Sequence, residues 1–246
     1  MTSVDAEGAS RAAAGETEVR DFVRYTFLRM GPAWRQRSRQ ERLAGIDELQ
    51  EVLQAPPAGL MLRTFSLVGT KAGVDAMLWT VSPRLESLQE LEARIGGTRM
   101  GAVLDVPFAY LGMGRRSEYL GGHDHGGQEG GRVSMGTKPY LFVYPFVKKR
   151  AWYGLPFKER QRIMGEHFRI GHQFPEVEIH TGYSFGLDDP EFILSFGADD
   201  PATFLDLVQA LRPSEASRYT EIETPIFTCV ACPPRRMLEL GSGIVP

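Results

Sequence analysis

The chain has 246 residues, of which 42% are hydrophobic, and a formal net charge of −3 at pH 7. This length and apolar content suffice for a buried core in one large domain or two small ones. The charge balance gives no reason to expect nucleic acid as a partner. No run of about 18 apolar residues predicts a membrane span, and the first residues lack the basic and then apolar layout of a secretion signal. We therefore expect a cytoplasmic protein.

The first half of the chain predicts one α+β unit behind a polar leader. Residues 1–18 are small and polar without a regular period, which is typical of a segment without fixed structure. Apolar residues then recur at strand or helix spacing in six segments, separated by glycine and proline. These are a strand at 22–30, a helix around 43–53, strands at about 60–68 and 74–81, a helix at 83–95 and a strand at about 102–111. The order β-α-β-β-α-β is that of a ferredoxin-like unit.

The second half repeats this pattern with an offset of 118 residues. Without a gap, the offset aligns similar residues, among them Phe22 with Tyr140, Glu48 with Glu166, and Pro83 with Pro201. The predicted elements are a strand at 140–148, a helix at 156–171, strands at about 176–185 and 191–197, a helix at 200–211 and a strand near 225–230. Each copy leaves one sheet face in need of cover, so two tandem ferredoxin-like repeats are expected to form a dimeric α+β barrel.

Five segments follow from this organisation. They are a disordered leader at 1–18, an N-terminal repeat at 19–114, a junction loop at 115–136, a C-terminal repeat at 137–232 and a tail at 233–246.

One histidine lies on the apolar face of the helix predicted at 156–171. His167 shares this face with Ile163, and a histidine in such a stripe is most often a hydrogen-bonded core residue. The alternative is a buried metal ligand, most simply an axial haem ligand. Because the offset pairs His167 with Leu49, packing alone does not require a histidine here, which favours the ligand.

The remaining histidines give weaker signals. His180 lies on the same face of a predicted strand as Glu176 and Glu178, which indicates a solvated face, and His172 follows the predicted end of its helix. His123 and His125 form an HxH pair in the glycine-rich junction loop. Without a third ligand nearby, a loop that binds no metal is the simpler interpretation.

Cys229 and Cys232 are the two cysteines of the chain, and they form a single CVAC motif at the end of a predicted strand. A CxxC motif could bind a metal or cycle between redox states. With no second pair and no following helix, two buried or edge thiols in a reducing compartment are the favoured interpretation.

Several motifs in order carry a resemblance to a known family. They are YPFVKKRAWYGLP, ERQRIMGEHFRIG, GYSFGLDDPEFILSF, LRPSEASRY and TPIFT. This series resembles the chlorite-dismutase-like family of haem proteins, and within it the chain is most similar to the coproheme decarboxylases of the actinobacterial type. The resemblance covers nearly all of residues 20–230.

The resemblance implies a haem site in the second repeat. His167 matches the family's proximal iron ligand, and Glu215 matches the acidic partner of that histidine's other ring nitrogen. Trp152 matches an aromatic residue packed on the proximal side. Tyr144 matches the tyrosine that becomes a radical in the decarboxylases, and Lys148 matches a lysine that binds a propionate.

Shorter matches imply the remaining contacts. Ser217 and Arg132 match further propionate-binding residues. In the actinobacterial type a histidine of the junction loop is the distal base, and the stretch SEYLGGH favours His123 while leaving His125 open. Other family members carry arginine or glutamine before the GLDD turn, at a position that here falls at about Ile179, and isoleucine can supply neither group. This difference argues against chlorite chemistry.

The function implied is the hydrogen-peroxide-dependent oxidative decarboxylation of Fe-coproporphyrin III (coproheme) to haem b, through a three-propionate intermediate. The iron porphyrin would be both substrate and redox cofactor. The family further implies a homopentamer and a transient contact with coproporphyrin ferrochelatase. Three alternatives remain at this point: a chlorite dismutase-like enzyme, a generic haem peroxidase, and a haem-free α+β barrel that acts as a scaffold.

Overall fold

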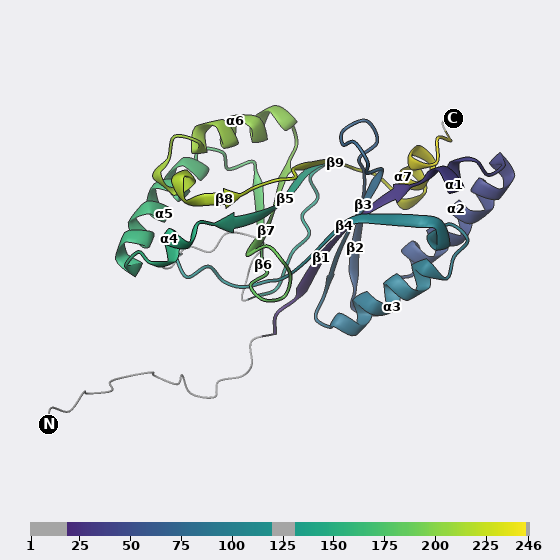
Figure 1. Ribbon diagram of the computed structural model, residues 1–246, viewed down its shortest axis with the longest axis horizontal. Coiled ribbons are helices and arrows are strands. Elements are labelled where there is room, and N and C mark those ends of the chain that lie inside the picture. Colours follow the sequence, from purple (N-terminus) through teal and green to yellow (C-terminus); the bar gives the residue numbers. More distant parts are fainter. Residues whose placement is uncertain (1–18, 120–130, 245–246) are drawn as a thin grey trace, which may run out of the picture.

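The computed structural model describes residues 19–119 and 131–244 (Figure 1). The junction-loop histidines His123 and His125 lie outside these described residues. The first repeat consists of β1 (Phe22–Met30), α1 (Pro32–Arg35), α2 (Arg39–Gln54), β2 (Met61–Ser66), β3 (Ala76–Ser82), α3 (Leu85–Gly96), η1 (Gly101–Val103) and β4 (Leu104–Met113). The remaining elements are β5 (Tyr140–Lys148), α4 (Arg150–Tyr153), α5 (Phe157–Gly171), β6 (Glu178–Tyr183), β7 (Phe192–Ala198), α6 (Pro201–Leu211), η2 (Glu215–Tyr219), β8 (Thr220–Ile222), β9 (Phe227–Ala231) and α7 (Pro234–Gly241).

Local sequence signals explain where the main helices begin. The α2 helix starts with a capping box, in which the Ser38 side chain accepts from the Glu41 backbone and Glu41 accepts from the Ser38 backbone. The α6 helix starts with Asp200 as N-cap and a proline in its first turn. Both signals satisfy backbone groups that a helix start leaves free.

The two repeats have the same strand order and close into one barrel. Hydrogen-bonded neighbours run β4-β1-β3-β2 in the first repeat and β6-β7-β5-β9 in the second. The edges join through Phe65 opposite Ala231 and through Met113 opposite Tyr183, so the ring of strands is continuous. The offset of 118 residues places β1 on β5 residue for residue. The expectation of two tandem ferredoxin-like repeats in a dimeric α+β barrel is confirmed.

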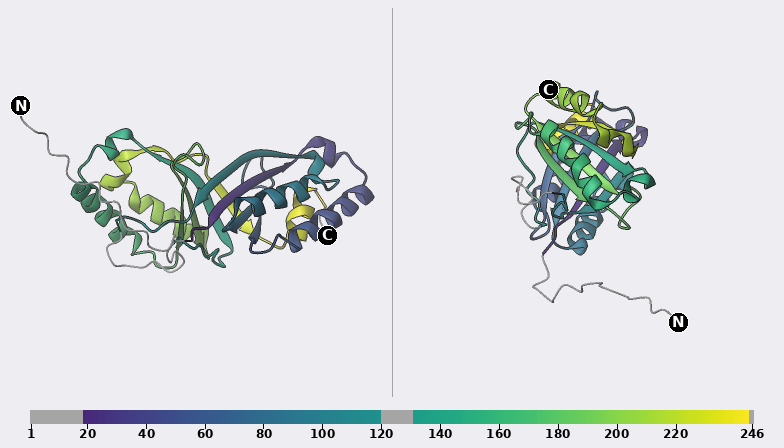
Figure 2. Two further views of the ribbon diagram at one scale, coloured as in Figure 1. Left: turned by 90° about the horizontal axis from the view of Figure 1, so that it is seen from below. Right: turned by 90° about the vertical axis from the view of Figure 1, so that its left-hand side faces the viewer.

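The helices of the first repeat lie at one end of the molecule and those of the second repeat at the other, with the strands between them (Figures 1 and 2). One core fills the interior of the barrel, where Phe27 of β1 stacks on Phe227 of β9 at a ring distance of 3.9 Å. A second core lies between the first sheet and the helices α2, α3 and α7, and a third lies between the second sheet and α6. Both faces of the strands are therefore covered.

The C-terminal segment differs from the expected tail. The structure forms α7, whose Met237 and Leu238 are fully buried in the core of the first repeat. The Trp34 indole nitrogen donates to the Ser242 hydroxyl at 2.8 Å, which ties the end of α7 to α1. The last strand of the second repeat thus leads back to the helices of the first.

Candidate functional site

Alternate residues of β5 face two different cores. Leu141 and Val143 point into the barrel, whereas Phe142 and Tyr144 belong to the core on the helix side of the sheet. Because side chains alternate along a strand, Lys148 at the end of β5 falls on the same face as Tyr144.

The α5 helix lies over this face but packs less closely than its counterpart in the first repeat. In α2, Ile46 and Leu49 are fully buried, whereas the aligned residues of α5, Met164 and His167, are only half-buried. On the sheet, Ile179 of β6 remains 42% exposed. The first repeat fills its helix–sheet interface with apolar side chains, and the second leaves apolar surface accessible on both sides of the interface.

His167 is placed in this accessible region by α5. Burial and, to a smaller extent, the positive charge of Lys148 lower the pKa of its imidazole to about 4. A lowered pKa means that the ring is neutral at pH 7, which is the form that binds a metal ion.

Lys148 is a half-buried cation held against aromatic rings. Its ammonium lies 4.2 Å from the centre of the Trp152 ring and 5.4 Å from that of Phe146. Burial lowers its pKa to about 8, and the carboxylate of Glu191 opposes this shift. Among the described residues, Lys148 makes no ion pair, so its charge is available to an anionic ligand.

Tyr144 lies between the sheet and α6. Its ring stacks on Phe196 at 5.8 Å, and burial raises the pKa of its hydroxyl well above the ordinary value. It lines an open groove of about 560 Å³ between β5, α6 and the β8–β9 connection. Arg212 and Glu223 form an ion pair at the side of this groove. Sequence analysis had not selected either of these residues: Arg212 lies in the motif LRPSEASRY but was given no role there, and Glu223 belongs to none of the quoted motifs.

Trp152 is buried in a small core formed by α4, α5 and η2. It packs with Ile163 and Ala216, and the ring of Tyr119 lies edge-on to it at 6.2 Å. Arg160 of α5 donates to the Tyr119 hydroxyl at 3.2 Å. This core therefore supports Lys148, which rests on the other side of Trp152.

Three predicted ligand-binding residues have partners other than those expected. The Glu215 carboxylate accepts from Arg162 at 2.7 Å, and among the described residues no hydrogen bond joins it to His167. The Ser217 hydroxyl donates to the Arg212 carbonyl oxygen at 2.6 Å. Arg132 pairs with Asp21, at the start of the first repeat, at 3.0 Å. These interactions satisfy the same polar groups that the prediction assigned to the haem and its ligand.

The prediction of a solvated His180 is wrong. Its side chain is 5% exposed and faces the barrel interior, where its ring lies 5.1 Å from that of Trp79. Neither ring nitrogen has a hydrogen-bond partner, and neither does the indole nitrogen of Trp79. Burial and, to a smaller extent, the positive charge of Arg63 lower the pKa of His180 to about 4. Although the Glu178 carboxylate lies 3.8 Å away, it is itself partly exposed and does not offset these effects.

The two cysteines agree with the favoured interpretation. Cys229 is buried in the barrel interior, Cys232 packs at the edge of the core of the first repeat, and both are free thiols. Within the described ranges, no group of three or more His, Cys, Asp or Glu side chains could hold a metal ion.

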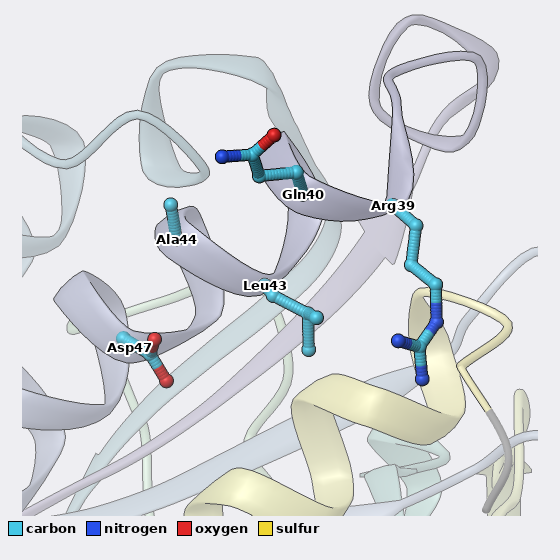
Figure 3. A pocket seen from close by; sticks show the side chains of 5 residues that line it. All are labelled: Arg39, Gln40, Leu43, Ala44 and Asp47. Atoms are coloured by element: carbon cyan, nitrogen blue, oxygen red, sulfur yellow. The ribbon is translucent and has the colours of Figure 1, made fainter.

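A second hollow lies on the first repeat, far from these residues in the sequence. It is a shallow surface depression along the first turns of α2, beside α7 (Figure 3). Its lining residues are Arg39, Gln40, Leu43, Ala44 and Asp47. None of them was selected by sequence analysis, and the depression contains no buried titratable group, so we assign it no function.

In the described part of the chain, no helix is long and apolar enough to cross a membrane.

Comparison with known proteins identifies the family and the fold of this chain. Residues 42–232 match the family described as chlorite dismutase. A coproheme decarboxylase from Mycolicibacterium smegmatis is 32% identical over 195 residues, which cover 77% of this chain and 81% of that protein. A crystal structure of a mutant chlorite dismutase from Candidatus Nitrospira defluvii has a TM-score of 0.82 at 22% identity and covers 92% of this chain and 97% of its own. The crystal structure of a putative chlorite dismutase has a TM-score of 0.76 at 19% identity and covers 89% of this chain and 98% of its own. The two structures share the fold, and because the family match spans most of the sequence, this chain belongs to the chlorite dismutase family.

Proposed function

We propose that this protein is a coproheme decarboxylase that uses hydrogen peroxide to convert Fe-coproporphyrin III to haem b. Two propionates lose their carboxyl groups in turn, and the three-propionate porphyrin is the intermediate. In each step a CH2CH2COO⁻ side chain becomes CH=CH2, while one hydrogen peroxide and one proton are consumed and one carbon dioxide and two water molecules are released. The curated relative from Mycolicibacterium smegmatis, which is named coproheme decarboxylase, supports this proposal.

The observation that carries the proposal is the arrangement of three side chains on facing elements. Tyr144 and Lys148 share one sheet face, and His167 lies on the incompletely packed helix that covers this face. A flat apolar ring needs accessible apolar surface, its propionates need a cation, and its iron needs a neutral nitrogen ligand. The interface between α5 and the sheet offers all three, so the residues fit an iron porphyrin.

Within this proposal, each residue has a defined task. His167 is the iron ligand, and its lowered pKa keeps the ligating nitrogen free of a proton at neutral pH. Lys148 binds a propionate through its unpaired ammonium, with Ser217 and Arg132 as further contacts of this kind, and Trp152 supports Lys148 and packs beside the ligand. These contacts decide which propionate faces Tyr144, which is a positioning effect.

Tyr144 carries the hydrogen transfer in this scheme. Its raised pKa keeps the phenol protonated, so a hydrogen atom is present to be lost when the site is oxidised. The resulting tyrosyl oxygen then takes a hydrogen atom from the β-carbon of the propionate. Hydrogen peroxide is the oxidant, and the bound iron porphyrin would transmit its oxidising power to Tyr144. On the distal side, we assign His123 as the base that takes the first proton of peroxide, with His125 as the alternative.

Two further assignments concern the proximal side and the assembly. Glu215 is proposed to orient His167 once the porphyrin is bound, which requires it to exchange its present partner Arg162. We also propose a cytoplasmic homopentamer with a transient contact to coproporphyrin ferrochelatase, which would hand over the substrate. Native mass spectrometry of the purified protein tests the pentamer directly.

One experiment separates this proposal from the alternatives. Apoprotein is titrated with ferric coproporphyrin III, and hydrogen peroxide is then added in steps while the porphyrin is analysed by mass spectrometry. We expect a shifted Soret band on binding, followed by losses of one and then two carboxyl groups. A generic peroxidase would bind the porphyrin and consume peroxide but leave all four propionates in place, and a scaffold protein would not shift the Soret band.

A further inference from the structure

Glu191 is a buried carboxylate in the turn between β6 and β7, and 7% of its surface is exposed. Its Oε2 accepts hydrogen bonds from the Lys148 backbone nitrogen at 2.8 Å and from the Tyr153 hydroxyl at 2.6 Å. Its Oε1 accepts from the Arg150 guanidinium at 3.3 Å. A buried carboxylate is costly unless such donors surround it. All three donors belong to the corner at which β5 ends and α4 begins.

On its β7 side this corner lies beyond the end of the sheet, whereas on the other side Lys148 pairs with Thr220 of β8. The pairing of β5 with β7 ends at Phe146 opposite Phe192, so Lys148 lies beyond the last pair of this ladder. The Glu191 side chain supplies the acceptor for the Lys148 N–H in place of a β7 backbone carbonyl. Together with the pairing of Lys148 to β8, this bond holds the backbone of Lys148 extended, with its side chain on the face of Phe146. The bond to Tyr153 fixes α4, and with it the neighbouring Trp152.

The first repeat contains the same arrangement. The Asp75 carboxylate, just before β3, accepts from the Met30 backbone nitrogen at 2.8 Å and from Arg35 at 2.7 Å. With the offset of 118 residues, Met30 corresponds to Lys148 and Arg35 to Tyr153. Both repeats therefore use a carboxylate to hold the end of their first strand and the short helix that follows. At the position that the carboxylate holds, the first repeat has the uncharged Met30, whereas the second has Lys148.

We infer that Glu191 is a positioning residue of the substrate site, which holds the β5–α4 corner so that the Lys148 ammonium faces a propionate of the porphyrin. This inference rests on the proposed function. Glu191 does not touch the substrate in this account. It acts through the backbone of Lys148 and through Tyr153, and it also places a negative charge near the ammonium, which favours the charged form of Lys148.

A double-mutant cycle tests whether Glu191 acts through Lys148. The dissociation constant of metal-free coproporphyrin III is measured by fluorescence for the parent protein, Glu191→Ala, Lys148→Met and the double variant. We expect Glu191→Ala to weaken binding about tenfold in the parent and to have little further effect once Lys148 is methionine, because coupled residues are not additive. An equal loss in both backgrounds would mean that Glu191 supports the fold in general, and would overturn the inference.

Two further variants keep the test decisive if Glu191→Ala folds poorly. In Glu191→Gln, one amide oxygen can still accept from both the Lys148 N–H and the Tyr153 hydroxyl, so affinity should stay within about threefold of the parent. Tyr153→Phe removes one of these bonds and should weaken binding less than Glu191→Ala does. If the folded Glu191→Gln protein binds as weakly as the alanine variant, the hydrogen bonds to the corner are not what positions Lys148.

Asp75→Ala is the matched control, since it removes the corresponding carboxylate from the first repeat, where Met30 stands in place of Lys148. It should lower the melting temperature and leave the affinity for coproporphyrin III unchanged. A parent protein that does not bind coproporphyrin III at all would refute the proposed function. A parent that binds, together with a folded Glu191→Ala variant of equal affinity, would refute only the role of Glu191.

Discussion

The ammonium of Lys148 lies 4.2 Å from the centre of the Trp152 ring, on the sheet face that also carries Tyr144. The ring faces partly compensate for the water that the ammonium loses on burial, but they do not neutralise its charge. Because the described residues provide no ion-pair partner, this charge is most stable when an anion approaches. A carboxylate at the edge of a flat apolar molecule has the required chemistry.

Lys148→Met should therefore weaken the binding of coproporphyrin III by about 10- to 100-fold, because a hydrogen bond to a charged group contributes about 1.5–3 kcal/mol. Methionine keeps most of the apolar stem against Trp152, so the melting temperature should change little. The measurement is a fluorescence titration. Lys149→Met, at the exposed neighbouring position, is the control and should bind like the parent. Equal affinities of the two variants would exclude Lys148 from the propionate site.

His167→Ala should abolish the ferric-ligand spectrum of bound coproheme while the protein still folds. The aligned position of the first repeat holds Leu49, so the architecture does not require a histidine there. By contrast, Leu49→Ala should destabilise the protein by about 2–5 kcal/mol, because it leaves a cavity in a fully buried core. Absorption spectra and urea unfolding of both variants check this contrast. An unchanged spectrum in His167→Ala would move the ligand to another histidine, with His172 tested next.

Tyr144→Phe should bind coproheme normally and stop its decarboxylation. The change removes the phenolic hydrogen and leaves the stacking on Phe196 in place. Mass spectrometry after peroxide addition should show coproheme with all four propionates. Tyr140→Phe, on the same strand face, is a suitable control and should still form haem b. Normal turnover in Tyr144→Phe would reject a radical at this site and would support the plain peroxidase alternative.

The strands and long helices could be predicted from the sequence because each carries a clear hydrophobic period. The strand predicted at 140–148 is β5 without any change in its bounds, and the two repeats align as the offset requires. The short C-terminal α7 was missed. Its two core residues, Met237 and Leu238, are adjacent and flanked by charges, so eight residues are too few to show a helical period.

The site could be predicted only in part, for two physical reasons. In a barrel whose outer faces are covered by helices, both faces of a strand are buried, so alternation does not tell the interior from the helix side. This is why His180 was placed in solvent although it lies in the barrel. Second, the partner of a charged residue depends on tertiary structure: Glu215 meets Arg162 of α5, and Glu191 meets Lys148, without any local signal in the sequence.

For the distal base, we expect His123→Ala to slow peroxide activation by about 10²–10⁴-fold, the usual contribution of a positioned general base. His125→Ala should have a much smaller effect. Stopped-flow absorption of the coproheme complex with peroxide provides the rates, and raising the pH should partly restore the His123 variant because the peroxide anion needs no base. If both single variants and the double variant react at the parent rate, the proton is taken by water or by a propionate of the substrate.

His180 should make the stability of the apoprotein depend on pH. In the folded state its pKa is about 4, below the ordinary value of 6.5, so the unfolded chain binds a proton more readily than the folded one between these values. Stability is then fully present above about pH 6.5 and is lost as the pH falls towards 4, by about 1.4 kcal/mol for each pH unit.

His180→Phe cannot take up this proton, and it removes two ring nitrogens that have no partner. Between pH 7 and pH 5, the unfolding free energy of the parent should therefore fall by about 2 kcal/mol more than that of the variant, as measured by urea unfolding. Trp79→Phe removes the neighbouring unpaired nitrogen without changing any titrating group, so it should keep the pH dependence of the parent. If the parent and His180→Phe lose stability in parallel, the proton that destabilises the fold binds elsewhere.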